Sequence, residues 1–352
     1  MRVFPGAVAR LAGLSAPHAP LFGWLAGAVV LSAVFVYLSA LMNALGEVGK
    51  LAVLQVAAPA SMALLALPTA VAARQGREQP LVLILVLSTA AAVAAAALLL
   101  WNRHEDLRTW FGGRGGWWSN AALRRFFSIS GAMLASGLIS SLTLVAIRAR
   151  IVRLEGLTAA GEFDAAWTIS MNHVTLVLAS LQSYYLPLLA RTREAGARAA
   201  QISAVLVPAA LTAACVIAGI ALLKAWILGL LYSHEFVPAA RYLRWTLLGD
   251  YLKVTSWILS VPMLASADME MFLAADVAAW SAFAAGAWVF SIWKTPAESA
   301  AMAFAGMYVV HALVSAAYVW RRHAFSPDRR TWVVWGSGLG LVAATSGWNW
   351  TS

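Results

Sequence analysis

Apolar stretches of about twenty residues recur along this chain, from residue 21 almost to its C-terminus. Each is long enough to cross roughly 30 Å of hydrocarbon as a helix that rises about 1.5 Å per residue. The predicted stretches cover residues 21–42, 51–73, 79–101, 127–149, 163–189, 201–231, 243–266, 271–293, 298–320 and 331–348. A transmembrane barrel would show shorter, alternating segments of about ten residues. We therefore predict an all-α integral membrane protein, a polytopic bundle of about ten transmembrane helices.

Composition agrees with this prediction and restricts the partners. Apolar residues make up 62% of the 352 residues and charged residues 11%, whereas a soluble domain is about half apolar and about a quarter charged. The net charge is +10, but its Lys and Arg residues are scattered over short loops. Anionic lipids or an anionic substrate, and not nucleic acid, are the predicted partners. The single cysteine, Cys215, excludes an intrachain disulfide and is predicted to be a small core residue.

The longest polar connection divides the chain. We predict a partial amino-terminal lobe of three helices over residues 1–101 and a cytoplasmic inter-lobe loop over 102–126. A carboxy-terminal lobe of six helices follows over 127–323, with an additional helix and tail over 324–352. With the loop over 102–126 in the cytoplasm, the larger share of the Lys and Arg residues lies on the cytoplasmic side of the membrane, as the positive-inside rule favours.

The sequence contains no motif of an enzyme: no metal-spaced His and Glu cluster, no Gly-rich phosphate loop and no nucleophile elbow. Neither an enzymatic activity nor a metal or other cofactor is predicted. The segment GLGLV at residues 338–342 is interpreted as a packing face. His173 and His311 each stand alone on an apolar stretch, which favours hydrogen-bonded structural histidines over a proton relay.

Ionisable residues inside the apolar stretches are the best indication of a site, because such groups usually face a hydrated cavity or one another. Asp250 and Lys253 are three residues apart, so they share one helix face and can meet. Asp276, on the next stretch, would complete a gating or coupling network. The pattern leaves open whether Asp250 and Lys253 form a gate or a mutually neutralising pair that only sets helix rotation.

Other intramembrane cations are candidate substrate ligands. Arg148 and Arg150 lie at the predicted end of the fourth helix, where they would either hold an anionic headgroup or anchor the helix end at the interface. Together with Lys253 they form the predicted substrate-binding set. Lys224 is predicted to extend its side chain toward the nearer membrane surface.

Several segments resemble the Wzx-type flippases of polysaccharide assembly, including the O-antigen and lipid III translocases of the MATE-like MOP superfamily. The most specific matches are YYLP at Tyr184–Pro187 and LLGDYLK at Leu247–Lys253. Further matching segments are SALMNALGEVGK, ALRRFFSISGAMLASGLISSLTLVAIRAR, GEFDAAWTIS, SYYLPLLARTRE and FLAADV. The similarity extends over residues 35–323. The family often has an acidic residue where this chain has Met171 and Asn172, so an ion-coupling site is not expected there.

The resemblance implies two lobes of six helices around a central cavity. It implies that alternating access moves an undecaprenyl-diphosphate-linked oligosaccharide, an O-antigen or enterobacterial-common-antigen-like repeat unit, across the bacterial inner membrane. The implied partners are this substrate, membrane lipids and the polysaccharide polymerase machinery. If residues 43–50 follow the family's fourth helix, the first three helices are absent, and we expect an upstream reading frame that encodes them.

Other classes of function match parts of the pattern. An ion-coupled exporter of small amphipathic compounds on the same fold would carry several acidic residues and few cations in its helices. Here Asp250 and Asp276 stand against Lys224, Lys253 and the bordering Arg148, which favours the flippase. A membrane glycosyltransferase would need a large external loop with catalytic residues, and the predicted loops are short. A non-transporting scaffold is the expectation only for a genuinely truncated chain.

Overall fold

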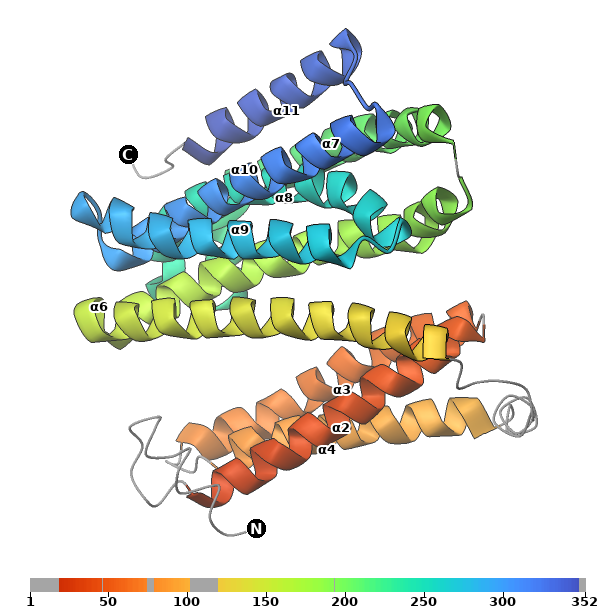
Figure 1. Ribbon diagram of the computed structural model, residues 1–352. Helices are drawn as coiled ribbons and strands as arrows, with labels where there is room; N and C mark the ends of the chain where they lie inside the picture. The colour runs from red at the N-terminus through yellow and green to blue at the C-terminus, as the bar shows by residue number, and fades with distance from the viewer. Residues whose placement is uncertain (1–18, 46, 75–78, 102–119, 193, 348–352) are drawn as a thin grey trace. The chain divides into compact units, whose positions relative to one another are not determined.

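The computed structural model describes residues 19–45, 47–74, 79–101, 120–192 and 194–347 (Figure 1). Within these ranges the chain is helical almost throughout and has no strand. Seven helical segments of the same ranges are long and apolar enough to cross a membrane. The prediction of an all-α, polytopic membrane protein is confirmed.

Each predicted apolar stretch corresponds to a helix or to one arm of a helix. The stretches at 243–266 and 331–348 form helices that are too polar over their length to count among the seven. The stretches at 127–149 and 163–189 lie on the two sides of a sharp bend at Gly156 within Asn120–Arg191, and Phe126–Val174 counts as a single segment across this bend.

The helices form two compact units, Met1–Gly116 and Trp117–Ser352. The division falls within the loop predicted over residues 102–126, of which 102–119 lie outside the described residues. Residues 120–126 are helical, so the prediction of a loop was wrong at this end. The assignment of the two units to transporter lobes stays a prediction.

The first unit is a bundle of α2 (Ala19–Ala44), α3 (Val48–Arg74) and α4 (Gln79–Trp101). Helix α4 packs against both α2 and α3, which have little contact with each other. Its buried core is small and consists of Met42, Leu54, Ala96 and Leu100. Most large apolar side chains point outward instead, as expected of helices whose outer faces contact lipid.

In its described residues the second unit contains six α-helices and two short 3-10 segments. They are α6 (Asn120–Arg191), α7 (Ala195–Leu231), η2 (His234–Ala239), α8 (Ala240–Ala265), α9 (Met269–Val289), η3 (Phe290–Ile292), α10 (Pro296–His323) and α11 (Arg329–Gly347). Helix α8 contacts every other α-helix of the unit. It is therefore the central element, which explains why this helix is extensively buried although it is too polar to count among the seven segments.

Helix α6 consists of two antiparallel arms that reverse direction at Gly156 (Figure 1). Gly156 has φ 89° and ψ 179°, a backbone conformation that residues with a Cβ atom rarely adopt. The first arm continues to the residue before Gly156. Arg148 and Arg150 therefore lie inside the first arm and not at its end, which corrects the predicted helix boundary.

Close packing of α8 against α10 depends on Gly249. A Cβ atom at this position would collide with the ring of Phe304 and lie 3.2 Å from the Cα atom of Ala305. The absence of a side chain lets the two helices approach closely. Gly249 directly precedes Asp250, so this contact also determines how Asp250 is placed in the bundle.

Helix α11 packs on α7 and α8 through polar and small residues. The Tyr251 hydroxyl donates to the Trp335 carbonyl over 2.8 Å, and Gly338 lies against the same hydroxyl. The interpretation of residues 338–342 as a packing face is confirmed. Lys224 is 4% exposed, and its Nζ donates to the Ser346 carbonyl over 2.9 Å. The prediction that Lys224 extends to the surface was wrong, because the carbonyls at the end of α11 attract its charge.

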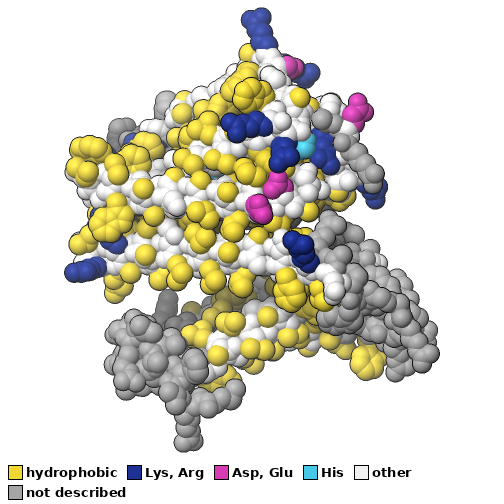
Figure 2. Space-filling view, viewed as in Figure 1, with side chains coloured by type: hydrophobic (Ala, Val, Ile, Leu, Met, Phe, Trp, Pro, Cys, Tyr) yellow, Lys and Arg dark blue, Asp and Glu magenta, His cyan; other side chains and the backbone are white. Residues whose placement is uncertain are grey.

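Hydrophobic side chains cover most of the visible face of the second unit, and charged side chains gather mainly toward the right-hand ends of its helices (Figure 2). Trp226, Leu230 and Trp288 are among the outward-facing apolar residues. Cys215 is also exposed, so its prediction as a core residue was wrong. An apolar thiol is tolerated on a surface that faces lipid.

Candidate functional site

Asp250 lies at the centre of the second unit with its side chain completely buried. The Ser170 hydroxyl donates to Oδ1 of Asp250 over 2.8 Å. The Nε2 atom of His173 lies 3.5 Å from Oδ2 of the same carboxylate. Ser170 and His173 are one helical turn apart on the second arm of α6, so they present both groups to α8 from the same face.

The orientation of His173 is determined by the backbone of its own helix. Its Nδ1 atom lies 2.8 Å from the carbonyl oxygen of Ile169, one turn earlier. A carbonyl only accepts hydrogen bonds, so Nδ1 bears the hydrogen and Nε2 is directed at Asp250.

Lys253 does not form an ion pair with Asp250 in the part of the chain that the structure describes. Its Nζ atom lies 3.3 Å from the Met171 sulfur and 5.8 Å from the centre of the Tyr308 ring. The direct pair that the spacing permits is not formed, because groups from α6 surround the carboxylate while the lysine extends toward α6 and α10. Its charge is still close enough to act on Asp250 electrostatically.

Asp276 forms a second cluster of the same residue types. The Ser136 hydroxyl, on the first arm of α6, donates to Oδ2 of Asp276. The Nε2 atom of His311, on α10, lies 3.5 Å from Oδ1. Tyr308 lies one turn before His311, and their ring centres are 6.4 Å apart.

Tyr308 lies near groups of both clusters. Its ring centre is 5.8 Å from the Nζ atom of Lys253 and 6.4 Å from the ring centre of His311. Among the described residues, the predicted network of Asp250, Lys253 and Asp276 is not a chain of direct contacts. Its role in gating or coupling stays a prediction.

The sequence analysis did not predict that two histidines and two serines lie beside these carboxylates. His173 and His311 looked isolated because their carboxylate partners lie on other helices. The available signal was local: Ser170 with His173, and Tyr308 with His311, each share a helix face at a spacing of three residues.

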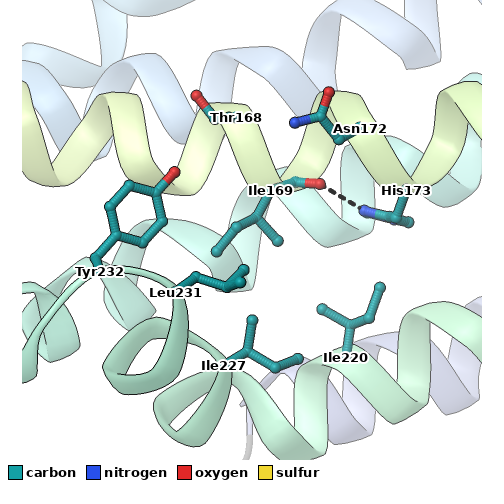
Figure 3. A pocket seen from close by; sticks show the side chains of 8 residues that line it. All are labelled: Thr168, Ile169, Asn172, His173, Ile220, Ile227, Leu231 and Tyr232. Atoms are coloured by element: carbon teal, nitrogen blue, oxygen red, sulfur yellow. Dashed lines mark hydrogen bonds between the residues drawn. The ribbon is translucent and has the colours of Figure 1, made fainter. Parts of the chain in front are cut away.

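A pocket of about 580 Å³ opens between the second arm of α6 and α7 (Figure 3). Its wall on α7 is largely aliphatic, with the Tyr232 ring at one end. Its wall on α6 contributes Thr168, Asn172 and His173. His173 thus lines the pocket with one part of its ring while Nε2 is directed at buried Asp250. The histidine connects an open cavity with the interior of the bundle.

Arg148 and Arg150 are engaged by protein groups. The Nε atom of Arg148 donates to Oδ1 of Asp164 over 2.6 Å, which ties the two arms of α6 together near Gly156. Arg150 donates to the Ala287 carbonyl over 3.0 Å and to the Ser291 hydroxyl over 2.7 Å. Residues two apart on a helix point to different sides. The structure therefore does not bring these arginines together with each other or with Lys253, and their contact with substrate stays a prediction.

The side chains of the two clusters are ionisable groups and hydroxyls. Among the residues that the structure describes, no three His, Cys, Asp or Glu side chains are grouped closely enough to hold a metal ion. The two clusters instead offer two carboxylates, two imidazoles and one ammonium group inside an apolar bundle. Groups of this kind inside a membrane protein usually mark the path of a substrate or ion.

The chain is similar to flippases of known function. It is 26% identical over 211 residues to the lipid III flippase of Escherichia coli (strain K12), a match that covers 56% of this chain and 49% of that protein. The lipid III flippase of Shigella flexneri matches with the same values. The chain therefore spans about half the length of the curated relatives it matches. No protein-family profile and no solved structure matches it. This distant homology supports a flippase family for the chain.

Proposed function

We propose that this protein moves a lipid-linked oligosaccharide across the bacterial inner membrane by alternating access. The substrate class is an oligosaccharide joined through diphosphate to undecaprenol, such as an O-antigen or enterobacterial-common-antigen-like repeat unit. The observation that carries the proposal is the distant similarity to lipid III flippases. The proposed partners are membrane lipids and the polysaccharide polymerase machinery that uses the translocated unit. The relation to the MOP superfamily belongs to the same proposal.

Lys253 is the proposed ligand of the diphosphate. Among the described residues its hydrogen-bond acceptor is the Met171 sulfur, which accepts only weakly. Its ammonium group thus retains donors for an oxyanion, whereas Arg148 already pairs with Asp164. A charge-assisted bond to a phosphate oxygen would satisfy Lys253 more completely than the thioether does. Arg148 and Arg150 would bind substrate only after exchanging their present partners.

A transporter accounts for the buried charges better than an enzyme does. An ion-coupled exporter of small amphipathic compounds remains a second candidate, because each of the two carboxylates lies beside a histidine. Lys253 distinguishes the two proposals. It favours an anionic substrate and disfavours a cationic one.

The test is translocation by the purified full chain in lipid vesicles. A fluorescent undecaprenyl-diphosphate oligosaccharide is placed in both leaflets, and a membrane-impermeant quencher reports how fast the label crosses. We expect quenching to proceed beyond the outer leaflet with the wild-type chain. Lys253→Gln should slow crossing about tenfold, as expected from the loss of one charge-assisted hydrogen bond. Lys294→Gln, which removes an exposed lysine paired with Glu298, is the matched control.

A cellular test complements the vesicles. Loss of the gene should cause lipid-linked oligosaccharide to accumulate at the inner leaflet, and neither Lys253→Ala nor Arg148→Ala should restore export. Full restoration of export by both variants would show that these two side chains do not bind the substrate, and it would not contradict the flippase proposal. Wild-type vesicles that extrude an amphipathic dye but do not flip the labelled lipid would favour the exporter.

A further inference from the structure

Two buried acceptor atoms face each other in the Asp250 cluster. The Nδ1 atom of His173 bears the hydrogen that it donates to the Ile169 carbonyl, so Nε2 of a neutral imidazole has only a lone pair. The atom it faces, Oδ2 of Asp250, is also an acceptor when the carboxylate is ionised, and the two are 3.5 Å apart. Neither atom has a hydrogen-bond partner among the described residues, and both are buried. One proton between them would satisfy both.

We propose that Ser170, Asp250 and His173 form a binding site for one exchangeable proton, and that this proton controls the positive charge that Lys253 presents to an anionic ligand. The proton comes from water in the pocket between α6 and α7, where His173 is accessible. It is held either on Nε2, as imidazolium beside carboxylate, or on Oδ2, as a carboxyl group that donates to Nε2. In both arrangements the charge of the Asp250 and His173 pair rises from −1 to 0.

The Asp276 cluster provides an internal contrast. Here Nδ1 of His311 is buried without a hydrogen-bond partner among the described residues. His311 is therefore free to carry its hydrogen on Nε2, the atom that faces Oδ1 of Asp276. A neutral histidine then satisfies the carboxylate, and no additional proton is required.

The charges around the site determine the consequence of protonation. Lys253 lies on α8, Tyr308 and His311 on α10, Asp276 on α9 and Tyr232 across the pocket, directly after α7. Lys224, a buried cation of α7, donates to the Ser346 carbonyl. Without the proton, Asp250 offsets the charge of Lys253. With the proton bound, the ammonium group is uncompensated and its affinity for a diphosphate rises.

Proton binding is measured first, on the purified full chain in detergent with little buffer. Acid is added from alkaline to mildly acidic pH, and proton uptake is compared among variants. We expect wild type and Asp276→Asn to take up one proton more than His173→Gln, whose amide donates to Asp250 without an added proton. Asp250→Asn should lose the same proton. Equal uptake by wild type and His173→Gln would overturn the proposal.

Infrared difference spectra of the wild-type chain do not depend on whether a variant folds. Acidification should produce either the carbonyl stretch of a protonated carboxyl or the ring modes of imidazolium. Isotope-labelled histidine and Asp250→Asn assign the bands. A wild-type spectrum with neither signal contradicts the proposal, even if both variants fail to fold.

The link to Lys253 rests on the proposed function and is tested separately. Undecaprenyl diphosphate in lipid nanodiscs is titrated with the chain at mildly acidic and mildly alkaline pH. Wild type should bind about tenfold more tightly at acidic pH, within the usual range of coupling between two sites. The diphosphate also changes its own protonation with pH. The binding of undecaprenyl diphosphate by His173→Gln at the same two pH values measures this contribution and serves as the control. Equal pH dependence in both proteins would show that the proton does not control Lys253.

The outcomes separate the two proposals. A chain that takes up the proton but does not flip the labelled lipid disproves the proposed function and leaves the proton site intact. A chain that flips the lipid without proton uptake at His173 and Asp250 disproves only the proton site.

Discussion

The Asp250 and Asp276 clusters of the second unit contain the same three residue types in different surroundings. Each carboxylate accepts a hydrogen bond from a serine of α6 and lies 3.5 Å from the Nε2 atom of a histidine. The Asp250 side chain is 0% exposed, whereas that of Asp276 is 19% exposed. The Ile169 carbonyl binds the second nitrogen of His173, whereas Nδ1 of His311 has no such partner among the residues that the structure describes. The Ile169 carbonyl occupies the only hydrogen of a neutral His173, so the Asp250 cluster requires an added proton for a hydrogen bond between the two side chains, whereas the Asp276 cluster does not.

The largest effect is expected from a change that disturbs the contact between α8 and α10, the helices that carry Asp250 and His311. Gly249→Ala should destabilise the chain by about 1–3 kcal/mol, because the added methyl group overlaps the Phe304 ring. Thermal unfolding of the purified protein in detergent measures the loss. Gly306→Ala is the control, since a Cβ atom there meets nothing within 4 Å. Equal melting temperatures for the two variants would show that α8 and α10 are not closely packed.

A direct comparison of the clusters comes next in size. Asp250→Asn should lower the flipping rate about tenfold, because it removes a fully buried charge that accepts charge-assisted hydrogen bonds. Asp276→Asn should lower it only about two- to threefold, because this carboxylate is partly exposed and better compensated. Rates are measured in vesicles that contain equal amounts of folded protein. A larger loss for Asp276→Asn would reverse the ranking.

The double variant tests whether the clusters act independently. Because Tyr308 lies beside Lys253 of one cluster and His311 of the other, the effects of Asp250→Asn and Asp276→Asn should deviate from additivity by about 0.5–1 kcal/mol. The deviation should shrink when the cycle is repeated with Tyr308→Phe. Strict additivity in both backgrounds would mean that Tyr308 does not connect the two clusters.

Asp328 is an exposed carboxylate outside the predicted membrane spans, so it can be compared with the carboxylates of the two clusters inside the helix bundle. Its Oδ1 accepts from the Thr331 amide over 2.8 Å, and hydrogen bonds to Thr331 lower its pKa. The pKa in the folded state is thus below that of the unfolded chain. Its contribution to the start of α11 is therefore present above the unfolded pKa, about 3.9, and is lost as the pH falls through the folded one.

The expected effect is small and local. Amide exchange at Thr331 should become relatively faster in wild type than in Asp328→Asn as the medium is made strongly acidic, because the asparagine cap does not titrate. The exchange of amides in the middle of α11 serves as the internal reference. If the ratio of the Thr331 exchange rates in wild type and variant is the same at all pH values, the charge of Asp328 does not stabilise the start of α11.

Much of the fold and part of the site could be predicted from the sequence. Helix number and approximate bounds follow from local hydropathy, because a segment must satisfy its backbone hydrogen bonds within itself when it crosses lipid. The LLGDYLK motif lies on α8, which is the central helix of the second unit. Asp250 and Lys253 were conspicuous because charges are rare inside apolar stretches.

The sequence did not reveal which groups these charges meet. Ser170 is 80 positions from Asp250, and Ser136 is 140 positions from Asp276. Neither pairing leaves a periodic trace in the chain, because it depends on how the helices pack. The same is true of Arg148 beside Asp164 and of Lys224 beside the Ser346 carbonyl. Local hydropathy defines which segments become helices, whereas the partner of a buried charge is set by contacts between helices distant in the sequence.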